Sequence, residues 1–149
     1  MNVQTMSAQQ LAEASAQAMW NEDRASQWLG MRIDAIAPGQ ATLSMDVARN
    51  MTNGHDSCHG GFIFTLADSA FAFACNSYNQ RAVAQMVQIT YIAPAFAGDR
   101  LTAQAREISR RGRSGIYDIR VSNQKGEHIA EFRGHSRIVK GTLVPETTE

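Results

Sequence analysis

The sequence has no excess of either charge, because its 14 lysines and arginines balance 14 aspartates and glutamates. A chain without net charge generates no global field that would attract nucleic acid or an anionic membrane. We therefore expect neither of them as a partner. Any polyanionic ligand must instead be bound by a local group of basic residues.

Cysteine is scarce as well, and the two cysteines, Cys58 and Cys75, show no paired spacing. This usage fits a reducing compartment better than a disulfide framework. The first residues lack a basic segment followed by an apolar core, so we expect no secretory signal. The longest apolar run, about fourteen residues, is shorter than the roughly twenty needed to cross a bilayer. Together these features predict a cytoplasmic protein.

Internal repeats and low-complexity segments are also absent. A chain of 149 residues is long enough to bury a substantial core in one domain. We therefore predict a single domain over residues 1–149, with a helical segment at residues 1–30 and a frayed tail at residues 142–149.

The helical segment carries recognisable helix signals. Ser7 and Gln10 have the spacing of a capping box, and Asn21 is placed to cap a second short helix. Trp28 and Leu29 are expected to pack inward at the end of that second helix.

From Met31 onward the apolar residues follow a period of two, which is typical of strands with one buried face. The strand-like runs cover residues 31–35, 41–47, 83–92, 101–108, 115–122 and 129–139. Residues 62–75 have the composition of a helix, with apolar side chains on every side. Such a helix and the apolar face of an antiparallel sheet must each be covered. We therefore predict an α+β fold in which about six strands wrap around one long central helix, with a second copy of the chain shielding the remaining edges.

A polar loop precedes this helix, and the helix itself carries one carboxylate, Asp68. An ionised carboxylate among apolar residues is costly unless it has a partner. Asp68 is therefore the first candidate for a functional residue. The alternative is a structural role, in which the carboxylate caps a neighbouring loop.

The order of these elements resembles that of the hotdog-fold acyl-CoA thioesterases. The likeness is carried by His59-Gly60-Gly61 at the start of the helix, by Leu66-Ala67-Asp68-Ser69, and by the whole string from Asn53 to Asn76. It is greatest to the members of that family that act in phenylacetic acid degradation. The resemblance implies hydrolysis of an aryl-type CoA thioester, such as a hydroxylated phenylacetyl-CoA, and no cofactor is expected.

The resemblance also implies an assembly. In this family two subunits join their sheets into one, and the dimer is usually doubled into a tetramer. The active sites are shared, since the aspartate of one subunit faces the glycine amides of the other. We therefore expect a homodimer or homotetramer.

The chemistry of a thioesterase explains these residue types. Attack on the carbonyl builds negative charge on its oxygen, and the first amides of a helix are suited to stabilise that charge. Gly60 is the first choice for this donor, and Gly61 would let the substrate approach beside it. Asp68 would act as general base on a water or as the nucleophile itself.

Three polar neighbours are candidates for supporting roles. Asn53 is placed to orient the carboxylate or the attacking water, and Ser69 to hold that water. His59 would position the thioester carbonyl or the loop. It is a weaker choice than Asp68 for the general base. Related proteins usually carry threonine after the aspartate, and Ser69 keeps the hydroxyl with a less constrained rotamer.

Substrate contacts are less specific in the sequence. Arg111 and Arg113 belong to the densest basic cluster and would bind the phosphates of CoA, although an arginine-rich hairpin turn is more often only solvated. Phe71 either lines the pocket or belongs to the core, and helical spacing does not separate these two roles.

Other chemistries fit less well. A zinc site at His55, Cys58 and His59 would need a second group of ligands, so we expect no metal. Cys58 as nucleophile would need a base, and adjacent loop residues often point apart. Two alternatives stay open, a hotdog enoyl-CoA hydratase or dehydratase that pairs Asp68 with His59, and a non-catalytic acyl-CoA-binding domain.

Overall fold

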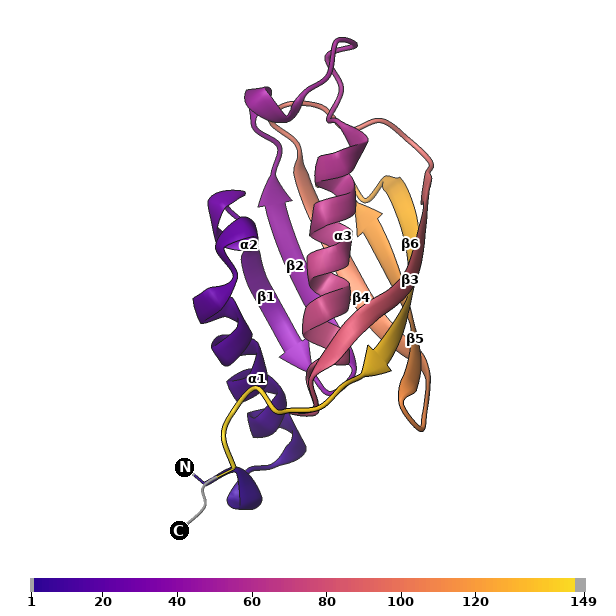
Figure 1. The fold of residues 1–149 in the computed structure, drawn as a ribbon. Helices are drawn as coiled ribbons and strands as arrows, with labels where there is room; N and C mark the ends of the chain where they lie inside the picture. Colours follow the sequence, from indigo (N-terminus) through magenta and orange to yellow (C-terminus); the bar gives the residue numbers. More distant parts are fainter. Residues whose placement is uncertain (1, 147–149) are drawn as a thin grey trace.

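The computed structural model describes residues 2–146 (Figure 1). Its helices are α1 (Ala8–Glu22), α2 (Arg24–Trp28) and α3 (Gly60–Cys75), with short 3₁₀ turns η1 (Val3–Thr5) and η2 (Arg49–Met51). Its strands are β1 (Arg32–Ala37), β2 (Gln40–Asp46), β3 (Ala82–Tyr91), β4 (Arg100–Arg111), β5 (Ser114–Ser122) and β6 (His128–Ile138). The predicted six strands and central helix are confirmed.

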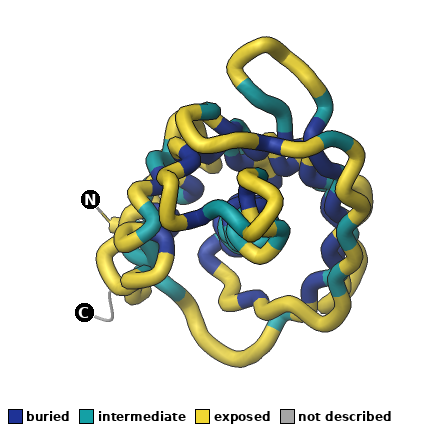
Figure 2. Tube along the Cα trace, turned by 90° about the horizontal axis from the view of Figure 1, so that it is seen from above, coloured by how far each residue is buried: buried dark blue, intermediate teal, exposed yellow. Residues whose placement is uncertain are grey.

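All six strands form one antiparallel sheet in the order β1-β2-β4-β5-β6-β3. The sheet curves around α3, which Figure 2 shows end-on inside the ring of strands. Strand β3 follows α3 in the chain but pairs with the last strand, β6, so it forms one edge of the sheet. The other edge, β1, runs alongside α1 (Figure 1).

The core lies between α3 and the concave face of the sheet. Phe71 is 1% exposed, and its ring packs against those of Tyr117 and Phe132 at centroid distances of 5.7 and 5.9 Å. A Cβ on Gly134 would lie 2.7 Å from the Phe71 ring, so glycine at that position makes room for it. Of the two roles that the sequence leaves open for Phe71, the structure places it in the core of this chain.

The N-terminal segment agrees with its signals in part. Ser7 and Gln10 form the predicted capping box at the start of α1. The second cap differs, because α1 continues through Glu22 and Asp23, rather than Asn21, caps α2 by accepting from the Ser26 amide at 3.0 Å. Trp28 does not pack inward and is 80% exposed, because α2 ends there after little more than one turn.

The end of the chain also differs from the expected frayed tail as far as Val144. The buried side chain of Asn79 accepts hydrogen bonds from the amides of Leu143 and Val144 at 3.0 and 2.8 Å, and it donates one to the Val144 carbonyl. These bonds hold the segment against the turn after α3. Residues 147–149 of the expected tail lie outside the described residues.

Within residues 2–146, none of the helices is long and apolar enough to cross a membrane.

Candidate active site

The loop before α3 delivers His59 to the start of the helix, where the histidine acts as N-cap. Its ring atom Nδ1 accepts a hydrogen bond from the Gly61 amide at 2.9 Å. This bond places the proton of a neutral imidazole on Nε2, which leaves His59 as a donor on its outer side. Nδ1 is therefore not available to accept a proton from a substrate or a water.

The Gly60 amide is left free by this arrangement. As the first residue of α3 it has no acceptor within the helix, and none of the described residues accepts its hydrogen. The positive end of the helix dipole adds to its attraction for negative charge. Of the two glycine amides predicted to form the site, Gly60 can donate to a substrate oxygen, and Gly61 is occupied by His59.

Packing accounts for both glycines. A Cβ on Gly60 would lie 2.9 Å from Cζ of Tyr91, whose hydroxyl donates a 2.8 Å hydrogen bond to the Gly60 carbonyl. A Cβ on Gly61 would lie 3.1 Å from the His59 ring. Here glycine makes room for these two side chains, in addition to leaving the Gly60 amide open to a ligand.

A groove of about 520 Å³ opens beside the Gly60 amide. It is lined by residues of the loop, of α3, and of the end of β3 and the segment after it, namely Ser57, Cys58, Gly60, Ile63, Tyr91, Ile92, Ala93 and Pro94. Burial raises the pKa of the Cys58 thiol to about 11, so this thiol stays protonated at neutral pH. The groove therefore offers a mostly apolar surface with one free backbone donor.

Asp68 lies two turns further along α3. Its carboxylate is half-buried and has no hydrogen bond or ion pair with any residue between 2 and 146. Burial raises the pKa of Asp68 above its ordinary value. A carboxylate that is desolvated and unpartnered is typical of a functional group rather than of a loop cap.

Ser69, the next residue, is held by the N-terminal segment. Its hydroxyl lies 2.8 Å from that of the buried Ser26, which donates to the Asp23 carboxylate at 2.6 Å. The chain Asp23–Ser26–Ser69 thus links α2 to the helix position beside Asp68.

Asn53 organises the loop. Its side-chain oxygen accepts from the amides of His55 and Ser57 at 2.9 and 3.3 Å and from the Ser57 hydroxyl at 3.2 Å. That oxygen is therefore engaged, and only the amide group of Asn53 is left to orient another ligand.

The arginine turn between β4 and β5 lies at the other end of α3 from Gly60 (Figure 1). Arg110 is held there, with its guanidinium 3.7 Å from the centroid of the Tyr78 ring and a 2.7 Å hydrogen bond to Gln80. Arg111 and Arg113 are exposed, and neither guanidinium forms an ion pair with the described residues. One chain therefore does not bring these arginines next to Gly60.

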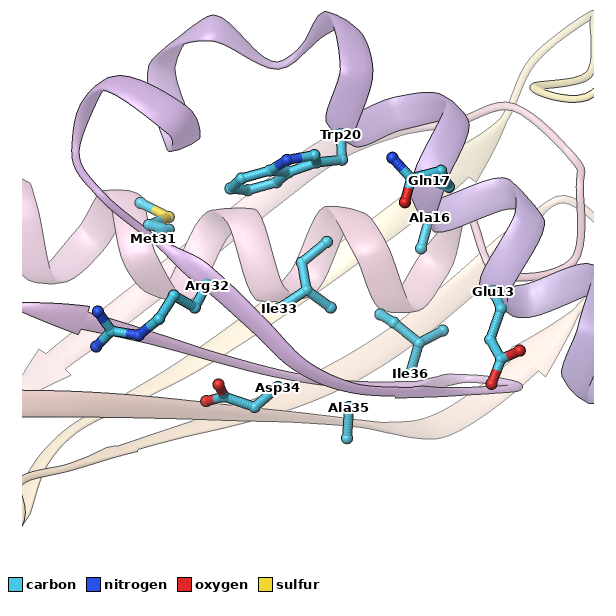
Figure 3. A pocket seen from close by; sticks show the side chains of 10 residues that line it. All are labelled: Glu13, Ala16, Gln17, Trp20, Met31, Arg32, Ile33, Asp34, Ala35 and Ile36. Atoms are coloured by element: carbon cyan, nitrogen blue, oxygen red, sulfur yellow. The ribbon is translucent and has the colours of Figure 1, made fainter.

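A second groove, of about 540 Å³, lies between α1 and β1 (Figure 3). The Trp20 ring, Met31 and Ile33 line its apolar part, and Glu13, Arg32 and Asp34 add charged groups. None of the site residues predicted from the sequence lines this groove.

A curved antiparallel sheet around one helix, with a free amide at the start of that helix, defines a hotdog-fold protein. Residues 55–130 match the family model of the thioesterase superfamily. The acyl-coenzyme A thioesterase PaaI of Escherichia coli (strain K12) is 44% identical over 132 residues, which cover 89% of this chain and 94% of that protein.

Two other comparisons agree. The solved structure of the E. coli PaaI protein from the phenylacetic acid degradation operon has a TM-score of 0.90 at 43% identity, with 91% of this chain and 99% of that chain covered. A putative esterase of Archaeoglobus fulgidus is 35% identical over 130 residues, 87% of this chain and 84% of its own length. The chain therefore belongs to the thioesterase superfamily, and it is an enzyme that hydrolyses thioester bonds.

Sequence reasoning missed three residues that the structure adds to the site, Tyr91, Ser26 and Asp23. Tyr91 is read from the sequence only as part of a strand, since its contact with Gly60 joins residues 31 positions apart. Asp23 has a local signal, because aspartate is as good an N-cap as asparagine.

Proposed function

We propose that this enzyme hydrolyses acyl-CoA thioesters to the free acid and CoA, with preference for an aryl-type acyl group such as hydroxylated phenylacetyl. One observation carries the proposal: α3 presents a free donor at Gly60 and an unpartnered, half-buried carboxylate at Asp68. The aryl preference is supported by the similarity to PaaI from the phenylacetic acid degradation operon.

In the proposed reaction the thioester oxygen accepts a hydrogen bond from the Gly60 amide. Negative charge grows on that oxygen as the carbonyl is attacked, so the donor stabilises the transition state more than the substrate. One such donor is worth roughly 3–4 kcal/mol of activation free energy. His59, with its proton on Nε2, positions the carbonyl or the loop as a donor.

Asp68 acts as the base on a water that attacks the carbonyl and displaces the CoA thiolate, or it attacks the carbonyl itself. In the second route the CoA thiolate leaves as an anhydride forms with Asp68, and water then hydrolyses that anhydride to the free acid. Its raised pKa makes the carboxylate a stronger proton acceptor than an ordinary aspartate. Ser69 holds the water, and the amide group of Asn53 orients the water or the carboxylate.

The site needs two copies of the chain. Gly60 and Asp68 are eight residues apart on α3, which corresponds to about 12 Å along the helix axis. One carbonyl group cannot be reached from both at once. We therefore assign the Gly60 of one subunit and the Asp68 of another to each site.

The edge of β3 is the surface we assign to this pairing. An unpaired edge strand offers free backbone donors and acceptors. On β3 and just beyond it, Val83, Met86 and Ile92 are exposed large hydrophobic residues. Two copies joined at β3 would form one continuous sheet as a homodimer, and pairing of such dimers would give a homotetramer, the two assemblies that the family resemblance implies.

The remaining substrate contacts follow from the same assembly. Arg111 and Arg113 have free guanidinium groups suited to the phosphates of CoA. Gly61 lies beside the reacting carbonyl. We place the enzyme in the cytoplasm, where acyl-CoA substrates and reduced cysteines occur together.

The test is release of free thiol from a panel of aryl and aliphatic acyl-CoAs. Wild type should release CoA, and Asp68→Asn should reduce kcat by roughly 10²–10⁴ with the fold intact. Glu13→Gln, which changes a carboxylate on α1, serves as the matched control. Wild-type rates in Asp68→Asn would refute the assigned mechanism. If wild type released no thiol from any acyl-CoA, hydration of an enoyl-CoA would favour the hydratase. Binding of acyl-CoA without any reaction would favour the non-catalytic binding domain.

A further inference from the structure

We propose that Tyr91 is a positioning residue for thioester hydrolysis, which holds Gly60 so that its amide points to the place where the substrate oxygen will lie. This inference rests on the proposed function of Gly60 as the oxyanion donor. Tyr91 touches neither the carbonyl nor the water in this scheme and acts through the backbone of α3.

Two contacts join Tyr91 to Gly60. The tyrosine hydroxyl donates to the Gly60 carbonyl oxygen at 2.8 Å. The ring occupies the place of a side chain at position 60, since a Cβ there would lie 2.9 Å from Cζ, 3.0 Å from Oη and 3.2 Å from Cε1. The end of β3 thus holds the first residue of α3 by a hydrogen bond and by ring packing.

His59 completes the arrangement from the other side. The peptide between Gly60 and Gly61 donates its N–H to Nδ1 of His59 at 2.9 Å, while its carbonyl accepts from Tyr91. Rotation of this peptide would break both hydrogen bonds. The two side chains therefore fix the plane of the peptide that follows the free Gly60 amide.

The contacts of Tyr91 and His59 compensate for the backbone flexibility of the glycines at the start of α3. Glycine has more backbone freedom than any other residue, and two consecutive glycines open α3. An oxyanion donor is effective when it is oriented before the reaction and does not need to reorganise. Tyr91 and His59 supply the orientation that the glycines themselves lack.

The hydroxyl is tested with Tyr91→Phe, which keeps the ring and removes the hydrogen bond. Loss of a whole oxyanion donor costs roughly 10²–10³ in kcat, so loss of its support should cost less, about tenfold, with KM within about twofold. Tyr78→Phe is the matched control, because it removes a hydroxyl from a hydrogen bond to Glu107 at the other end of α3. Wild-type kcat in Tyr91→Phe would overturn the proposal.

The ring is tested by thermal unfolding, which requires no activity. Gly60→Ala should lower the midpoint, because its methyl group meets the tyrosine ring. Adding Tyr91→Ala should restore part of that loss, because the space becomes vacant, so the two changes should be strongly non-additive. If the changes in the thermal midpoint were additive, the Tyr91 ring would not confine position 60.

The two readouts separate this inference from the proposed function. If wild type released no thiol from any acyl-CoA, the proposed function would fail, and non-additive midpoints would still show that Tyr91 confines Gly60. If wild type were active, Asp68→Asn inactive and Tyr91→Phe fully active, only the role of Tyr91 would fail. Because Tyr91 lies on the strand assigned to subunit pairing, the oligomeric state of each variant is measured by analytical ultracentrifugation.

Discussion

The hydroxyl groups of Ser26 and Ser69 lie 2.8 Å apart, and their contact fixes the direction in which Ser69 donates. Ser26 has one hydroxyl hydrogen, which it gives to the Asp23 carboxylate at 2.6 Å. Ser69 must therefore donate to Ser26, and the lone pairs of the Ser69 oxygen are left to accept. An acceptor at this position can receive a hydrogen bond from the attacking water. A lone pair of that water is then free to point at the carbonyl carbon.

This relationship predicts an effect of Asp23→Asn on turnover. Asparagine is as good an N-cap as aspartate, so α2 should persist. Its amide group would donate to Ser26, which would then donate to Ser69 and reverse the hydrogen bond. We expect kcat to fall about tenfold, as in Ser69→Ala, with no further loss in the double variant.

The control for that measurement is Ser7→Ala, which removes the capping box of α1 and leaves the Asp23–Ser26–Ser69 chain intact. It should lower stability by about 1 kcal/mol without a change in kcat. If Asp23→Asn and Ser69→Ala lowered kcat independently, so that their effects multiplied in the double variant, the role assigned to the Asp23–Ser26–Ser69 hydrogen bonds would be contradicted.

The raised pKa of Asp68 predicts how stability depends on pH. Between the ordinary pKa of 3.8 and the raised value, the folded protein retains a proton that the unfolded chain releases. The free energy of unfolding therefore decreases as pH rises through this window. Asp68→Asn removes this loss, so its thermal midpoint should equal or exceed that of wild type at neutral pH, and the difference should shrink in acid.

The measurement is the thermal midpoint of both proteins across a pH series. Asp56→Asn is the control, because Asp56 is exposed in a loop at a φ of 60° that asparagine also tolerates. A wild-type midpoint well above that of Asp68→Asn at neutral pH would contradict the prediction. It would mean that the ionised carboxylate is stabilised in the assembled protein.

Shared sites predict complementation between two inactive variants. Proline at position 60 would remove the amide donor, and it suits the first position of a helix after a residue with the extended ψ of 131° found at His59. Because any side chain there meets Tyr91, this variant is built as Gly60→Pro with Tyr91→Ala. Mixed with Asp68→Ala, it should form hybrid dimers that each contain one intact site.

Equal mixing with random exchange should restore about a quarter of wild-type activity. Tyr91→Ala alone and each inactive variant alone are the controls, and subunit exchange is verified by mass spectrometry of differently tagged chains. Confirmed exchange without any gain of activity would refute sites shared between subunits.

Many of the helices, strands and caps of this protein are determined by interactions between residues close in sequence. The period of two in the strands, the apolar helix with one carboxylate, the Ser7 capping box and the glycines that open α3 are local patterns. Backbone geometry converts such patterns directly into elements. The sequence alone therefore determined the six strands, the central helix and Asp68 and Gly60 as candidates.

Contacts between residues that are far apart in sequence are set by the tertiary structure. A period of two predicts that β3 is a strand but does not reveal that its last residue, Tyr91, contacts Gly60. In the same way, a helix signal does not show that Ser26 reaches Ser69, that Asn79 holds the C-terminal segment, or that Trp28 faces solvent. These contacts depend on the order of strands in the sheet and on the packing of the N-terminal helices, which are set by the burial of the whole chain rather than by any one segment.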